Sequence, residues 1–94
     1  MPVIKKPVNV IRCTYTETDE LRDFKVMDLE GLPEVAINAL YKIGCFTVGE
    51  VLDNWSKIPS IKGIGKVRVR HIKAAVFAQI CEMGLLKDAD VVTL

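Results

Sequence analysis

Apolar residues recur three or four positions apart through most of the chain after residue 32, which is the spacing of one face of a helix. The pattern predicts a helix over residues 33–43, a second helix from residue 47, a short helical piece within residues 54–60, and a long helix over residues 65–83. The apolar stripe of the long helix, which should face a core, comprises Val69, Ile72, Val76, Ile80 and Met83.

Residues typical of helix ends stand where the periodicity starts and stops. Pro33 suits a first helical position, and Gly44 and Gly84 are suited to ending the helices that precede them. Thr47 and Glu50 have the spacing of a capping box, in which each side chain satisfies a backbone N–H of the other residue. These signals support the predicted helix boundaries.

The N-terminal third has no clear helical period. Residues 1–15 alternate in side-chain type and include Pro2 and Pro7, so they are expected to be extended, as an edge strand or as an arm laid on the domain. Residues 16–30 are rich in Asp and Glu. They are expected to form a solvated linker or a short amphipathic turn, with an acidic arm that covers basic residues as the alternative.

These elements predict an all-α fold, a compact bundle of four to five short helices preceded by an extended N-terminal arm. A faint internal repeat aligns Leu40 and Val51 with Ile58 and Val69. Each unit is a helix end, a turn and a helix start, which predicts a tandem helix-hairpin-helix arrangement. The expected division is an arm and linker over residues 1–27, the helical domain over 28–86, and a C-terminal tail over 87–94.

The strongest candidate for a binding site is Gly63-Ile64-Gly65, at the start of the long helix. Glycine permits positive φ angles and lets a ligand approach the main chain, and a helix N-terminus favours an anion. Ile64 should point inward and hold the turn on the core. The sequence therefore predicts a hairpin that binds phosphate, against the plainer alternative of a structural turn among solvated Lys and Arg.

The charge distribution supports this interpretation although the net charge is only +1. Residues 55–81 contain six Lys or Arg and no Asp or Glu, whereas residues 1–54 contain six bases and nine acids. A basic block within an otherwise acidic chain produces the directional field that steers an anionic partner.

Other chemistry has little support. Cys13, Cys45 and Cys81 are far apart and form no Cys-x-x-Cys motif, so neither a disulfide framework nor a zinc site is expected. His71 has no nearby nucleophile or carboxylate in sequence and should be an exposed, neutral side chain. We expect no enzyme activity, metal or cofactor. No stretch has the length of a membrane span or the pattern of a signal peptide, and a cytoplasmic location is expected.

Residues 28–86 resemble the C-terminal domain of the bacterial RNA polymerase alpha subunit. The motifs that carry the resemblance are Asn38-Ala39-Leu40, Gly44, Thr47-Val48-Gly49-Glu50, Ile64-Gly65-Lys66 and Ile72-Lys73. The resemblance implies a four-helix fold of two hairpins that binds the minor groove of A·T-rich promoter DNA and contacts regulators.

The chain departs from that family at positions that contact DNA. Val35 stands where the family has its groove-reading arginine, Val67 replaces a lysine, Arg68 replaces a serine, and His71 replaces an acidic residue. Losing the arginine should reduce sequence preference, while contacts to the DNA backbone are retained. The residues expected to bind DNA are Asn38, Lys62, Gly63, Gly65, Lys66, Arg68 and Arg70.

The sequence therefore predicts a small, transcription-related module that binds double-stranded DNA at the minor groove or backbone, with RNA polymerase or a transcription regulator as its candidate protein partner. One alternative is a protein-interaction adaptor that keeps the fold, has lost DNA binding, and uses the small apolar face of Val67, Ala74 and Ala78. Another is a helix-hairpin-helix accessory to a nuclease or repair enzyme.

Overall fold

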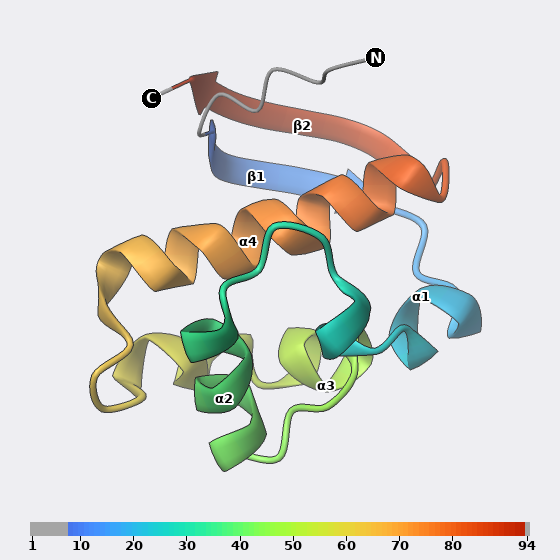
Figure 1. Cartoon of the computed structure of the whole chain (residues 1–94). Coiled ribbons are helices and arrows are strands. Elements are labelled where there is room, and N and C mark those ends of the chain that lie inside the picture. The colour runs from blue at the N-terminus through green and yellow to red at the C-terminus, as the bar shows by residue number, and fades with distance from the viewer. Residues whose placement is uncertain (1–7, 94) are drawn as a thin grey trace.

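A computed structural model describes residues 8–93 of the chain, with one long helix at the centre (Figure 1). The helix α4 (Gly65–Glu82) lies between a two-stranded sheet on one side and the shorter helices on the other. The remaining elements, in chain order, are β1 (Val8–Tyr15), α1 (Asp19–Asp23), the 3₁₀ helix η1 (Val26–Asp28), α2 (Glu34–Lys42), α3 (Val48–Asp53), the 3₁₀ helix η2 (Trp55–Ser60) and β2 (Leu86–Thr93).

The core forms on the apolar face predicted for the long helix. Ile72, Val76 and Ile80 of α4 are buried together with Leu40 of α2 and Val51 of α3. In α2 the helical spacing of Ala36, Leu40 and Ile43 predicts that all three face inward. Ala36 and Leu40 are buried, but Ile43 is 40% exposed, because it caps the C-terminus of α2 just before the chain turns at Gly44. The helical periodicity therefore predicts the core face of α4 well and that of α2 in part.

The helix ends form as their sequence signals predict. The Thr47 hydroxyl accepts a hydrogen bond from the Glu50 N–H at 3.3 Å, and the Glu50 carboxylate accepts one from the Thr47 N–H at 3.1 Å. This capping box begins α3. Gly44 and Gly84 follow α2 and α4 with φ angles of 80° and 71°. Glycine adopts such angles without steric cost.

The prediction of an all-α fold is wrong, because the two ends of the described chain pair as an antiparallel sheet. The segment expected as an extended arm contains β1, and residues 87–93 of the segment expected as a tail lie within β2. Arg12 stands opposite Asp90, and its Nε donates to an Asp90 carboxylate oxygen at 3.0 Å. The acidic residues that suggested a solvated tail are thus exposed partners in a strand pair.

The sheet is held on the rest of the molecule through its first strand. β1 packs along α4, and its Cys13 and Tyr15 side chains are half-buried against the core. Arg12 and Thr14 alternate with them and are exposed. This alternation is the period of a strand with one buried face, and it explains why β1 sits on the helix instead of extending away as an arm.

Residues 17–28 also join the core. Leu21 of α1 and Val26 of η1 are fully buried, whereas Met27, expected on the apolar side of this turn, is 61% exposed. Arg22 links α1 to α3 by donating to the Asp53 carboxylate at 2.6 Å and to Glu17 at 2.8 Å. The acidic segment is therefore a packed part of the fold.

Candidate nucleic-acid interface

The turn before α4 has the backbone geometry that its glycines predict. Gly63 and Gly65 have φ angles of 83° and 70°. Both angles lie in the region that favours glycine. Ile64 between them is 2% exposed, and its N–H donates to the Ile61 carbonyl at 3.2 Å. Ile64 therefore fixes the turn on the core, as expected, while the flanking glycines lie at the surface.

Among the described residues, none caps the N-terminus of α4 with its side chain, and the first turn of this helix carries no acid. In contrast, Thr18 caps α1 and Thr47 caps α3, and both helices carry acids in their first turns. The free N–H groups and positive dipole end of a helix favour an anion, and basic residues placed there are unfavourable without one. The start of α4 thus has the electrostatics of a site for an external phosphate.

Two of the predicted basic residues lie beside one open hollow at this helix end. Lys66 and Arg70 line it together with Gly65, Val69 and Pro59 of η2, and its volume is about 460 Å³. The two cations are four residues apart, so they lie on one side of α4 about 6 Å apart along its axis. A phosphate in this hollow would meet both side chains and the helix N-terminus.

Arg68 lies on a different side of α4. At about 100° per residue it is about 160° around the helix from Lys66. Its guanidinium donates to the carbonyls of Gly63 and Ile64, each at 3.4 Å, so it folds back over the hairpin turn. The structure therefore divides the predicted cations into two groups, Lys66 with Arg70 on one side and Arg68 on the other.

The remaining predicted residues are exposed and available. Lys62 lies in the hairpin turn, and Asn38 lies on α2, which contacts α4. Val35 and Val67, which replace basic residues of the resembled family, are 52% and 57% exposed. The exposure expected for Val35 is confirmed, and the family's DNA-contacting positions here carry an apolar surface.

Lys73 was missing from the predicted set. It follows Lys66 and Arg70 at the spacing i, i+4, i+7, so the three cations form one ridge along α4. Its ammonium lies 5.7 Å from the centre of the Trp55 ring. This cation–π contact holds Lys73 beside η2. The helical spacing alone was sufficient to find it.

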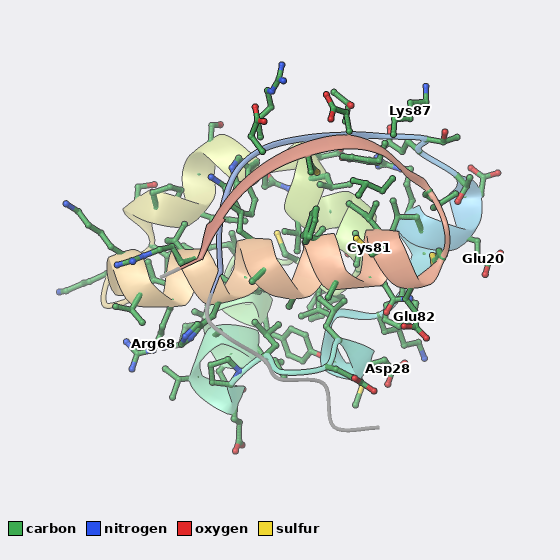
Figure 2. The ribbon with its side chains drawn as sticks, turned by 90° about the horizontal axis from the view of Figure 1, so that it is seen from above. Glu20, Asp28, Arg68, Cys81, Glu82 and Lys87 are labelled. Carbon is green, nitrogen blue, oxygen red and sulfur yellow. The ribbon has the colours of Figure 1, made fainter. Side chains whose placement is uncertain are left out.

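A group of acidic residues lies toward the other end of α4. Figure 2 shows Arg68 at one end of this helix and Glu20, Asp28 and Glu82 toward the opposite end. Asp28, Glu30 and Glu82 line a separate hollow of about 280 Å³. The alternative of an acidic arm that covers the basic block does not agree with this arrangement.

Residues with other chemistry do not converge within residues 8–93. No group of three or more His, Cys, Asp or Glu side chains in this range is placed to hold a metal ion, and none of its helices is both long and apolar enough to cross a bilayer. The three cysteines are free, and burial raises the pKa of each thiol. His71 is exposed.

Comparisons of this chain with known protein families, with curated proteins and with solved structures found no match.

Proposed function

We propose that this chain is a small DNA-binding module that contacts the phosphate backbone of double-stranded DNA through the Gly63-Ile64-Gly65 hairpin. The observation that carries the proposal is the coincidence at one helix end of two positive φ angles, an N-terminus that no described side chain caps, and the cations Lys66 and Arg70. The glycines let a ligand approach the main chain, and the uncapped N-terminus and the two cations favour a bound anion such as a phosphate.

The resemblance to the C-terminal domain of the RNA polymerase alpha subunit supports a role in transcription, with the polymerase or a transcription regulator as the protein partner. It also predicts that Asn38 lies near the DNA, and the position of Lys62 in the hairpin turn brings its charge close to the same site. Because Val35 and Val67 replace the family's basic residues, we propose that binding depends on the backbone and has little sequence preference.

The test is an amide chemical-shift titration of the full chain with an A·T-rich and a G·C-rich duplex of equal length. The proposal predicts that the largest shifts occur at Gly63, Gly65 and Lys66, with similar affinity for both duplexes. Shifts confined to β2 or α1, or no shifts at low salt, would exclude the hairpin as the binding site.

A second candidate function is a protein-interaction adaptor, and one specific observation favours it. Val35 and Val67 are large apolar side chains that remain more than half exposed. Val67 lies on the face of α4 that also carries Ala78, which is exposed, and Ala74, which is half-buried. Exposed apolar patches commonly mark sites of protein association. In this version DNA causes no shifts at the hairpin, and a protein partner causes shifts at Val67 and Ala78.

A further inference from the structure

A third and smaller hollow lies where β1 packs along α4, and Lys73 is the one residue of the proposed DNA interface that lines it. Its volume is about 150 Å³. Tyr15 of β1, Trp55 of η2 and Phe77 of α4 supply three aromatic rings, and three aliphatic side chains from α3 and α4 complete the apolar lining. The hollow is therefore formed by the N-terminal strand β1 together with α3, η2 and α4.

Among the described residues that line this hollow, the charged ones are two cations, Arg12 and Lys73. Arg12 forms ion pairs with Asp90 at 3.0 Å and with Asp88 at 3.8 Å. Lys73 contacts the face of Trp55, and no carboxylate of residues 8–93 lies within ion-pair distance of its ammonium. An apolar hollow with one cation that lacks such a carboxylate partner is complementary to a ligand with an apolar body and a single negative charge.

We propose that this hollow binds a small monocyclic aromatic carboxylate, with its ring against Trp55 and Phe77 and its carboxylate on Lys73. The size fits a single ring, because an apolar cavity of about 150 Å³ is large enough to bind benzene. Aromatic side chains favour offset or edge-to-face contact with such a ring. A neutral hydrocarbon would supply no negative charge to pair with Lys73. A phosphate would carry two negative charges, whereas Lys73 can neutralise only one.

The binding site shares only Lys73 with the proposed DNA interface, because the other residues that line it lie away from the hairpin. A ligand in this hollow would contact both β1 and α4. These two elements pack together in the structure, with Cys13 and Tyr15 of β1 against the core. Such a ligand would stabilise the docking of the sheet on the helix by binding only the folded chain.

The test is an NMR titration of the full chain with benzoate and with its neutral isostere benzamide. Trp55 is the sole tryptophan, so its indole N–H is a unique signal at the site. We expect saturable benzoate shifts at the Trp55 indole and at the Cys13 and Phe77 amides. Benzamide should bind about fivefold more weakly, the upper range for an exposed charge pair.

Two variants make the test specific. Lys73→Gln should weaken benzoate by about the same fivefold factor and leave benzamide unchanged, because it removes the charge and keeps much of the side-chain stem. Lys57→Gln, the same change at an exposed lysine outside the hollow, should leave benzoate affinity unchanged. Cys13→Leu, which adds bulk from β1, should abolish binding of both compounds.

The proposal is overturned if benzoate shifts stay linear with concentration, if benzamide binds as tightly as benzoate, or if Lys57→Gln weakens benzoate as much as Lys73→Gln does. Saturable benzoate binding that survives Cys13→Leu in a folded chain would place the ligand elsewhere and would overturn it as well.

Discussion

At the scale of single residues, the exposed valines on α2 and α4 are the features that most affect the proposed DNA contact. Val35 and Val67 occupy positions where the resembled family is basic, and both are more than half exposed. The resemblance drew attention to these two positions, and the structure shows that neither side chain belongs to the buried core.

Val35→Arg is therefore expected to add a DNA contact without harming the fold. An arginine side chain can enter a narrow A·T minor groove while its stem packs on the helix. We expect binding to an A-tract duplex to tighten by about 1–3 kcal/mol, with less gain on G·C-rich DNA. Titration of both duplexes measures this, with Val35→Gln as the neutral control.

The free energy of unfolding should change little in the Val35→Arg variant, because the position is exposed and arginine is a good helix former. A loss of several kcal/mol in denaturant melts would mean that Val35 packs more tightly than its exposed fraction of 52% indicates. Unchanged A-tract binding in a stable variant would favour the adaptor function.

Gly49 and Gly65 are favoured for different physical reasons, which the sequence alone does not distinguish. Gly65 has a φ of 70°, and no atom of the described residues lies within 4 Å of where its Cβ would be, so only the backbone angle requires glycine. Gly49 has an ordinary helical angle, but a Cβ there would lie 3.0 Å from the Arg22 carbonyl oxygen. From sequence, alanine in this helix would be expected to be favourable. In the structure, an added Cβ would require the neighbouring backbone of Arg22 to shift by a few tenths of an ångström, which opposes that gain.

Gly65→Ala should destabilise the chain by about 1–2 kcal/mol, the cost of a left-handed conformation for a residue with a Cβ. Gly65→Asn should recover part of that loss, since asparagine tolerates this region better. Denaturant melts of the two variants check the order. Equal stability of the alanine variant and the native chain would contradict the assigned backbone angle.

At the scale of elements, one arginine holds α1 against α3. Arg22 donates to Asp53 at 2.6 Å, and this hydrogen bond lowers the pKa of the Asp53 carboxyl from its ordinary value of 3.8. Because the pKa is lower in the folded chain, the contribution to stability is fully present above pH 3.8 and is lost as the pH falls through the folded value.

Asp53→Asn should therefore destabilise the chain at neutral pH and lose that effect in acid. The difference in the free energy of unfolding between the native chain and the variant should be constant near neutrality and should shrink below pH 3.8. Chemical denaturation at a series of pH values measures it. Asp23→Asn, at an exposed carboxylate with no ion pair among the described residues, should show no such change. A pH-independent difference for Asp53→Asn would contradict the role of the ion pair.

The elements also show what could be predicted from sequence and what could not. The helices were predictable because periodicity, Thr47 and the terminal glycines are local signals. β2 was not, because its partner strand lies near the other end of the chain and Asp88 and Asp90 are also typical of a solvated tail. Their pairing with Arg12 becomes visible only when the strands are side by side.

The candidate site, too, was predictable from the sequence only in part. The hairpin and its inward Ile64 followed from Gly63 and Gly65 alone. Helical geometry places Arg68 and Lys66 on different sides of α4. Treating the basic residues as one continuous stretch of sequence does not show this difference. The contact of Lys73 with Trp55 depends on where η2 packs, which no local pattern specifies.

At the scale of the whole molecule, the charges are arranged along α4. Lys66 and Arg70 line a hollow at its N-terminal end, whereas Asp28, Glu30 and Glu82 line another hollow. Figure 2 shows Arg68 toward the first end and Asp28 and Glu82 toward the other. Such a separation orients the domain in the field of a polyanion so that the hairpin approaches first. It is compatible with a net charge of only +1, because steering depends on the distribution of charge as well as its sum.

The central claim is that the hairpin end of α4 binds DNA phosphates, and the dependence of affinity on salt tests it most directly. With roughly three to five phosphates contacted, log K against log salt should have a slope of about −3 to −4.5, with dissociation constants on the order of 10⁻⁴ to 10⁻⁶ M.

Lys66→Gln with Arg70→Gln should make that slope shallower by about two, one for each lost phosphate contact. The matched double variant Lys25→Gln with Lys87→Gln removes the same charge from exposed positions outside the basic block and should keep the native slope. A flat salt dependence of the native chain, or an equal loss of slope in both double variants, would contradict the account.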